Sequence, residues 1–127
     1  KHFEVPVWEL LGGNVRDKIR LHLLSGGGTP EANFNAAKAA VDEGFTAVKF
    51  DPITSDCHEK GQARMIEDAV AITAAAREAG GPDLDLIIEL HRKLTPMVSI
   101  ALAEALNLGQ AFIHTQGPST GSRKDHQ

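Results

Sequence analysis

Two ionisable residues, Glu89 and His91, close an otherwise apolar run over residues 84–91. A run of this composition predicts a strand that is buried on both faces of a parallel sheet. Because strand side chains alternate, Ile87, Glu89 and His91 share one face. A charge buried there is costly unless a partner or a metal compensates it, and the carboxyl ends of such strands are where active sites form. Spacing alone leaves a second interpretation open, in which the strand end is simply hydrated.

A second polar pair, Lys49 and Asp51, closes the predicted strand Phe45–Phe50. Alternation puts both side chains on one face, and they face Glu89 and His91 if both strands turn their polar ends to the interior. A lysine beside carboxylates can position or polarise an anionic substrate, or act as a base if it is desolvated. The alternative is structural: an ion pair of Lys49 with Asp51 or Glu89 that holds adjacent strands, which geometry slightly favours.

Two loops carry weaker signals. Residues 25–29, Ser-Gly-Gly-Gly-Thr, lie between a strand and a helix start, where backbone N–H groups can bind an anion. They lack the dinucleotide fingerprint and the lysine of a P-loop, so we expect a flexible turn. Asp56, Cys57 and His58 are possible metal ligands, but structural zinc sites use four ligands in spaced pairs and no second pair exists. We expect a solvated loop.

The elements that position these residues alternate between helix and strand. After a short helix at Pro6–Leu11 we expect strands at Ile19–Leu24, Phe45–Phe50, Leu84–His91 and from Ala111, with helices from Thr29-Pro30 to Gly44, from about Gln62 to Ala79 and from Thr95-Pro96 through Leu106. The predicted apolar faces are Phe34, Ala37 and Val41 in the first long helix, and Met65, Ile66, Ala69, Val70, Thr73 and Ala76 in the second. This α/β alternation indicates a parallel sheet, either doubly wound or part of a (β/α) barrel. Barrels take about 250 residues, so four strands are half of one.

Composition narrows the class of protein. The chain has 127 residues, 42% hydrophobic and 24% charged, with a net charge of -4, which does not suggest a nucleic acid or an anionic membrane as partner. A single cysteine excludes an intrachain disulfide, and no signal peptide or membrane span is evident, so we expect a cytoplasmic protein. The first residue, Lys1, looks like a cut. Residues 114–127 have no strong apolar residue, which predicts a disordered tail or sequence foreign to the fold.

Three segments carry a family resemblance. They are Val5-Pro6-Val7-Trp8-Glu9-Leu10-Leu11-Gly12-Gly13 with Val15-Arg16, then Gly44-Phe45-Thr46-Ala47-Val48-Lys49-Phe50-Asp51-Pro52, then Ile88-Glu89-Leu90-His91-Arg92-Lys93-Leu94-Thr95-Pro96. In order and spacing the chain resembles the enolase superfamily, in its mandelate racemase/muconate lactonizing enzyme branch. More narrowly it is similar to acid-sugar dehydratases of the galactonate and gluconate type and to the starvation-sensing proteins related to them.

The resemblance implies an α+β capping domain followed by a (β/α)7β barrel. Residues 1–18 would be the linker helix that enters the barrel, residues 19–113 its first four strands, and residues 114–127 a divergent tail. The capping domain and the second half of the barrel would then be missing. The chain would be a fragment, with a frameshift or an artificial junction after Ile113.

The resemblance also implies a chemistry. Family members bind Mg²⁺ through three carboxylates, of which the first matches Glu89. The second would fall in the segment that here reads Phe112-Ile113-His114-Thr115-Gln116, and the third would lie beyond the chain. The metal stabilises the enediolate formed when the proton α to a carboxylate is removed. Racemases take that proton with the second lysine of a Lys-x-Lys pair, where this chain has Asp51.

The combination of Lys-x-Asp with Glu-x-His favours dehydration of a sugar acid. Glu89 would bind Mg²⁺, His91 would protonate the leaving hydroxyl, Lys49 would contact the substrate carboxylate or enediolate, and Asp51 would also bind substrate. The partner would be a small sugar acid, and the parent protein would be a homo-oligomer. With one carboxylate and no general base, the chain itself should be inactive. The alternatives are a non-catalytic sensing or binding relative, and a racemase or cycloisomerase, which Asp51 disfavours.

Overall fold

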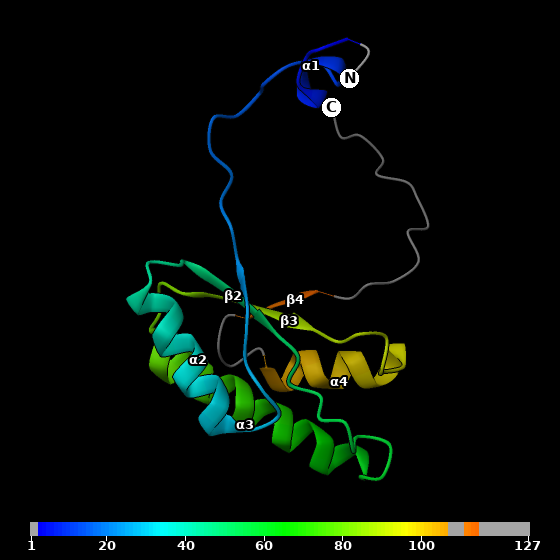
Figure 1. Cartoon of the computed structure of the whole chain (residues 1–127). Coiled ribbons are helices and arrows are strands. Elements are labelled where there is room, and N and C mark those ends of the chain that lie inside the picture. The colour runs from blue at the N-terminus through cyan, green and yellow to red at the C-terminus, as the bar shows by residue number, and fades with distance from the viewer. Residues whose placement is uncertain (1–2, 107–110, 115–127) are drawn as a thin grey trace, which may run out of the picture.

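The computed structural model describes residues 3–106 and 111–114, in which helices and strands alternate (Figure 1). The elements are α1 (Val7–Leu10), β1 (Leu23–Leu24), α2 (Pro30–Asp42), β2 (Ala47–Phe50), α3 (Gln62–Gly80), β3 (Asp85–Glu89), α4 (Pro96–Leu106) and β4 (Ala111–His114). All strand pairs are parallel and follow chain order, β1-β2-β3-β4. The α/β class predicted from the alternation is confirmed.

The sheet resolves the choice between the two predicted architectures. A doubly wound sheet reverses its strand order and carries helices on both faces. Here the strand order never reverses, and α2, α3 and α4 all lie on one side of the sheet (Figure 1). Successive right-handed crossovers on one side are how a (β/α) barrel is built. The described residues therefore form about half of such a barrel.

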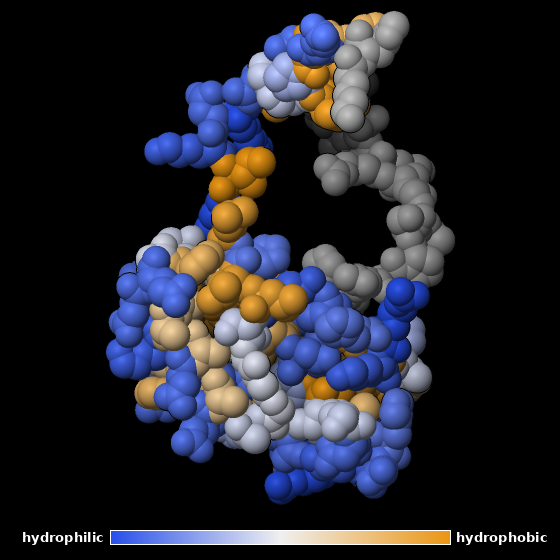
Figure 2. Space-filling view, in the orientation of Figure 1, coloured by the Kyte–Doolittle hydropathy of each residue, from blue (hydrophilic) through white to orange (hydrophobic). Residues whose placement is uncertain are grey.

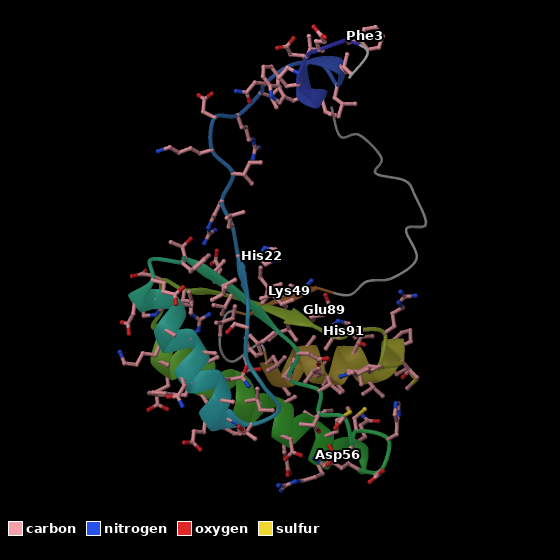
Figure 3. All side chains as sticks on the ribbon, in the orientation of Figure 1. Phe3, His22, Lys49, Asp56, Glu89 and His91 are labelled. Carbon is pink, nitrogen blue, oxygen red and sulfur yellow. The ribbon has the colours of Figure 1, made fainter. Side chains whose placement is uncertain are left out.

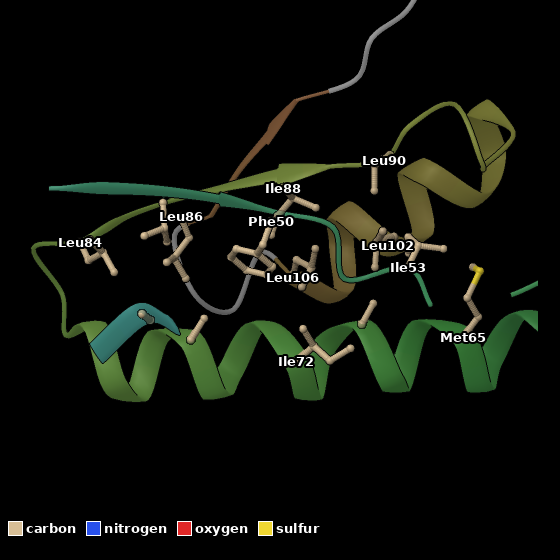
Figure 4. Close-up of a cluster of buried hydrophobic side chains, with 14 of the residues drawn as sticks. Phe50, Ile53, Met65, Ile72, Leu84, Leu86, Ile88, Leu90, Leu102 and Leu106 are labelled. Carbon is tan, nitrogen blue, oxygen red and sulfur yellow. The ribbon is translucent and has the colours of Figure 1, made fainter. Parts of the chain in front are cut away.

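The hydrophobic core lies between the sheet and the helices (Figure 4). Phe50 of β2 and Ile88 of β3 face α3 and α4, where Ile72 and Leu102 complete the packing. Register places Phe50 opposite Ile88 and Lys49 opposite Ile87. Since side chains alternate along a strand, the residues between these core positions point to the other face of the sheet. Lys49, Ile87 and Glu89 thus share the face that the helices do not cover.

Threonine-proline pairs begin two helices, as predicted. The Thr29 hydroxyl accepts a hydrogen bond from the N–H of Ala32 at 3.2 Å, and Pro30 is the first residue of α2. Thr95 does the same for the N–H of Val98 at 3.4 Å, before Pro96 opens α4. Both hydroxyls satisfy N–H groups that have no partner within the helix, which fixes where the helices begin.

The buried face of α2 agrees with the predicted one at Ala37 but is otherwise different. Asn33, Ala37 and Ala40 are buried, whereas Val41 is 43% exposed. Asn33 turns inward because its side-chain amide donates to backbone carbonyls of the preceding loop. In α3 the prediction is largely right, with Met65, Ala69, Thr73 and Ala76 buried, and Ile72 added.

The N-terminal segment is less regular than predicted. The predicted strand Ile19–Leu24 forms only at Leu23–Leu24, and the helix expected at Pro6–Leu11 covers Val7–Leu10. Apolar side chains of this segment stay exposed (Figure 2), including Val15, Ile19 and Leu21. The spacing of these apolar side chains is typical of an element with one buried face. The described residues do not provide a surface that covers this face.

The remaining predictions concern the end of the chain. β4 runs from Ala111 to His114, one residue past the predicted end of the barrel segment at residue 113. Asn107 and Gly109, predicted to end the last helix, and residues 115–127 of the predicted tail lie outside the described residues. Across the described part of the chain, no helix combines the length and apolar character needed to cross a membrane.

Candidate active site at the carboxyl edge of the sheet

Lys49 and Glu89 form a buried ion pair between β2 and β3 (Figure 3). The Lys49 Nζ lies 2.5 Å from Glu89 Oε2. Glu89 is 1% exposed, and the Lys49 side chain is 16% exposed. Of the two ion pairs predicted for Lys49, the structure shows the one with Glu89. The two charges compensate each other, which lets a carboxylate stay buried at the end of a strand.

Hydrogen bonds keep the Glu89 carboxylate ionised. The ammonium of Lys49 is the main cause that holds the pKa of Glu89 below the ordinary glutamate value, and it outweighs the opposing effect of burial. A smaller contribution comes from the backbone N–H of His91, which donates to Oε1 at 3.2 Å. Both oxygens of Glu89 therefore accept from positive or polar groups, and the group is a preformed anion.

Asp51 contacts the other predicted site residue, His91. The Nδ1 atom of His91 lies 3.1 Å from Asp51 Oδ2, and the ammonium of Lys93 donates to the same oxygen at 2.7 Å. The second oxygen, Oδ1, accepts from the N–H of Ile53 at 2.9 Å. The structure thus brings Asp51 to His91 and Lys49 to Glu89. The polar ends of β2 and β3 meet at one edge of the sheet, as alternation predicted.

A left-handed turn follows β3 and sets the position of His91. The N–H of Lys93 donates to the carbonyl of Leu90 at 2.9 Å, and the two residues between them, His91 and Arg92, have φ of 46° and 59°. Two consecutive positive φ values are those of a type I′ turn, which normally uses Gly, Asn or Asp. His91 is therefore held in a left-handed conformation that is uncommon for residues other than glycine, and such conformations are frequent at functional sites.

Lys93 also belongs to this cluster, although it was not predicted from the sequence as a site residue. Its ammonium bridges Asp51 and the carbonyl of Ile53, both on the loop after β2. The signal in the sequence was faint, because Lys93 follows the strand by several residues and period-2 alternation no longer applies beyond the turn.

In the loop at Asp56, Cys57 and His58, the carboxylate of Asp56 is engaged by neighbouring side chains. The carboxylate of Asp56 lies 2.9 Å from the Lys60 ammonium and also accepts from the Thr54 hydroxyl. These contacts, with Thr54 first, lower the pKa of Asp56. Within the described ranges, no three His, Cys, Asp or Glu side chains are grouped closely enough to hold a metal ion.

The side chain of Asn33 holds the glycine-rich turn in place. The Asn33 amide donates to the carbonyl of Gly27 and, at 2.9 Å, to the carbonyl of Thr29. Gly26 has φ of 106°, and a Cβ there would overlap the side chain of Asn33. The turn needs glycine for this close approach, which supports the structural interpretation of the motif.

Glu89 is the residue of this edge that the family resemblance assigns to Mg²⁺. It is an ionised carboxylate, the ligand type this cation prefers, but Mg²⁺ requires octahedral coordination by oxygen. Among the described residues, Glu89 does not belong to any group of three His, Cys, Asp or Glu side chains that could hold a metal ion. The described residues do not constitute a magnesium site by themselves.

Comparison with known proteins identifies the family. The family described as "Enolase C-terminal domain-like" matches residues 34–114, and the chain belongs to this family. The match begins in α2 and ends with β4, so it covers β2, β3 and β4, including both strands that carry the candidate site. The resemblance and the fold predicted from the three sequence segments are confirmed.

Individual relatives indicate which members of the family the chain is similar to. The chain is 34% identical over 108 residues to D-galactonate dehydratase of Pectobacterium atrosepticum, covering 82% of the chain and 27% of that protein. It is 34% identical to D-gluconate dehydratase of Thermoproteus tenax, covering 78% of the chain and 20% of that protein. A crystal structure of an enolase superfamily member from Salmonella Typhimurium superposes with a TM-score of 0.77 at 28% identity, over 87% of the chain and 34% of that structure. The chain thus spans 20–27% of the length of these two curated relatives.

Proposed function

We propose that the chain is part of a Mg²⁺-dependent acid-sugar dehydratase, which removes water from a sugar carboxylate to give a 2-keto-3-deoxy acid. The observation that carries the proposal is the buried, ionised Glu89 beside Lys49, followed at once by His91 at the carboxyl edge of the sheet. The names of the relatives, galactonate and gluconate dehydratase, support the substrate class.

Each residue has a distinct role in this proposal. Glu89 contributes one oxygen ligand to the metal, which supplies positive charge to an enediolate when it is bound. Lys49, whose ammonium faces the same edge, contacts the substrate carboxylate or the enediolate oxygens. His91, with a side chain that is 57% exposed, reaches the leaving group. The prediction that Asp51 binds substrate stays a prediction, because the side-chain contacts of its carboxylate are to His91 and Lys93.

His91 acts as general acid in the elimination. The electrons of the enediolate form a carbon–carbon double bond, the bond between the β-carbon and its hydroxyl oxygen breaks, and the oxygen takes a proton from the imidazole and leaves as water. The resulting enol then becomes the 2-keto acid. The base that removes the α-proton belongs, in this proposal, to the remainder of a longer protein.

The chain by itself is expected to be inactive, because one carboxylate does not hold Mg²⁺ for catalysis. The purified chain, assayed with a panel of aldonates and Mg²⁺, should form no 2-keto-3-deoxy acid above the level of a His91→Asn variant. Product formation by the chain that depends on Mg²⁺ and on His91 would contradict this part of the proposal.

The dehydratase assignment is tested on the longer protein from which we propose that the chain derives. With galactonate or gluconate, His91→Asn should abolish water loss while exchange of the α-proton in deuterium oxide continues. His58→Asn, which changes an exposed histidine outside the site, is the matched control and should leave both rates unchanged. Loss of exchange together with elimination in His91→Asn would argue against a leaving-group acid.

The same exchange and elimination measurements distinguish a dehydratase from two other functions. A non-catalytic sensing or binding relative would bind a sugar acid without exchange or elimination. A racemase or cycloisomerase would exchange the α-proton without elimination even with His91 intact. A homo-oligomeric parent, a cytoplasmic location, and the division into residues 1–18, 19–113 and 114–127 are further parts of the proposal.

A further inference from the structure

We propose that Asp51 is a positioning residue for His91: its carboxylate accepts the hydrogen on Nδ1 and leaves Nε2 as the nitrogen that faces the substrate. The inference rests on the proposed function, because it assigns the atom through which His91 delivers its proton. It also replaces substrate binding as the role of Asp51.

The donors around Asp51 determine which nitrogen of His91 carries a hydrogen. An ionised carboxylate offers only acceptors, and its oxygens already accept from the Ile53 N–H and the Lys93 ammonium. Nδ1 lies 3.1 Å from Oδ2, which is a hydrogen-bond distance. If Nδ1 bears the hydrogen, this contact is a hydrogen bond to Oδ2. If Nδ1 bears no hydrogen, its lone pair faces a lone pair of Oδ2 and the contact is repulsive. The geometry therefore selects the Nδ1–H form of the ring.

Contacts other than His91 hold the Asp51 carboxylate in place. The Ile53 N–H fixes Oδ1 within its own loop, and Lys93 fixes Oδ2 while it also donates to the Ile53 carbonyl at 2.7 Å. The acceptor is thus oriented by the loop and by Lys93 before the imidazole meets it. An acceptor held in this way can orient a neighbouring ring, as supporting hydrogen bonds do around catalytic groups.

The backbone at His91 needs such an external constraint. With positive φ at His91 and Arg92, the turn adopts a conformation that residues with side chains rarely populate. Conformations of this kind persist where the surroundings determine them. The link from Asp51 at the end of β2 to the turn after β3 is one such determinant, and it fixes the ring relative to the neighbouring strand.

The arrangement accounts for both ring hydrogens of the protonated His91 during the elimination. The Nε2 hydrogen passes to the departing hydroxyl oxygen as the carbon–oxygen bond breaks, and the electron pair of that bond stays with the oxygen. Water leaves, and the ring is left neutral with its remaining hydrogen on Nδ1, still donated to Asp51. Asp51 touches neither substrate nor leaving group in this step, so its effect is exerted through His91.

The test reads the tautomer of His91 directly in the 127-residue chain. The chain is labelled with ¹⁵N-histidine, and its Nδ1 and Nε2 resonances are recorded above the titration range of imidazole, with His91→Gln used to assign the signal. We expect His91 to be mainly the Nδ1–H form, whereas the exposed His58 shows the Nε2–H form that free histidine prefers. A wild-type His91 in the Nε2–H form overturns the proposal, whatever any variant does.

Two variants separate positioning from a general effect on the loop. Asp51→Asn replaces one acceptor oxygen by a donor and should shift His91 toward the Nε2–H form. Lys93→Met removes a donor from the same oxygen and should leave the Nδ1–H form dominant. If both variants change the tautomer equally, the loop and not the Asp51 carboxylate sets the ring, and the proposal fails. The readout needs no turnover, so a failed dehydratase assay would remove the proposed function and leave this result standing.

Discussion

Two lysine–carboxylate clusters in this chain have similar contacts but differ in how deeply their carboxylates are buried. Lys49 pairs with Glu89 at 2.5 Å across neighbouring strands, and Lys60 pairs with Asp56 at 2.9 Å and Asp68 at 2.8 Å beside a loop. In both clusters the pKa of a carboxyl group is lowered, at Glu89 mainly by Lys49 and at Asp56 by the Thr54 hydroxyl first and Lys60 second. The Glu89 side chain is 2% exposed, and that of Asp56 is 46% exposed.

The difference shows that ion-pair distance and a shifted pKa do not identify a functional site by themselves. Water and salt screen the charges around Lys60, and side-chain entropy opposes their pairing. At Glu89 the contact with Lys49 takes the place of hydration by water. Removal of either partner therefore leaves an uncompensated charge buried in the protein. Burial at the carboxyl edge of a parallel sheet is the feature that distinguishes the candidate site from the loop.

The largest expected effect comes from removing the buried lysine. Lys49→Met leaves the Glu89 carboxylate without its cation and should lower the free energy of unfolding by about 3 kcal/mol at pH 7. Urea denaturation followed by circular dichroism measures this. The double variant Lys49→Met/Glu89→Leu removes both charges and should recover most of the loss. If the double variant is as unstable as the single one, packing and not charge explains the effect.

Acidification should reduce the effect of Lys49→Met. The folded-state pKa of Glu89 lies below its unfolded value, so its contribution to stability is complete above the unfolded pKa, about 4.3, and is lost as pH falls through the folded pKa. In the variant, protonation of Glu89 also relieves the buried charge. Unfolding curves at a series of pH values should therefore converge for wild type and variant only as the pH falls through the lowered folded-state pKa of Glu89. A gap that stays constant from pH 7 into the acid range would contradict this.

At the strained turn next to the buried pair, we expect a smaller change in the free energy of unfolding, and this change should be stabilising. Among the described residues, the loop around Lys60 has no such strain, whereas Arg92 has φ of 59°. Arg92→Gly should stabilise the chain by about 0.5 kcal/mol, because relief of the left-handed conformation exceeds the entropy that glycine adds to the unfolded state. Arg64→Gly in α3 is the control and should destabilise by about 1 kcal/mol, since glycine is unfavourable inside helices. Thermal unfolding measures both, and destabilisation by Arg92→Gly would contradict the strain.

The smallest effect is expected at the loop cluster, where the side chains of Asp56, Lys60 and Asp68 are 46%, 25% and 21% exposed. Lys60→Met should lower the melting temperature by less than Lys49→Met does, since partly exposed pairs contribute little. Salt provides a second comparison: raising NaCl to about 1 M should move the pKa of Asp56 toward its ordinary value and leave that of Glu89 in place. Carboxyl carbon shifts in pH titrations by NMR measure both groups. Equal salt sensitivity would show that Glu89 is more accessible than the structure indicates.

Local signals predicted much of the fold and part of the site. Thr29-Pro30 and Thr95-Pro96 mark their helix starts because capping depends on neighbours in sequence, and alternation placed Lys49 and Glu89 on one face because it is a property of any strand. Whether Lys49 pairs with Asp51 or Glu89 depends on strand register, which one strand cannot specify. The link from Asp51 to His91 and Lys93 depends on a turn whose dihedral angles contradict the ordinary preferences of His and Arg. Asn33 faces inward for a similar reason, because its partners lie in the preceding loop.

The strand order has a consequence for how copies of this chain would associate. Among the described residues, β1 and β4 are the two edges of an all-parallel sheet, so a second copy that paired with these edges would meet the first head to tail, with its β1 against the β4 of its neighbour. Every copy keeps one edge of each kind after such a contact. A repeated head-to-tail contact ends only when the rotation between neighbours completes a circle, and otherwise continues as a filament. The curvature of the sheet, rather than the chemistry of its edges, therefore decides whether the assembly has a fixed stoichiometry.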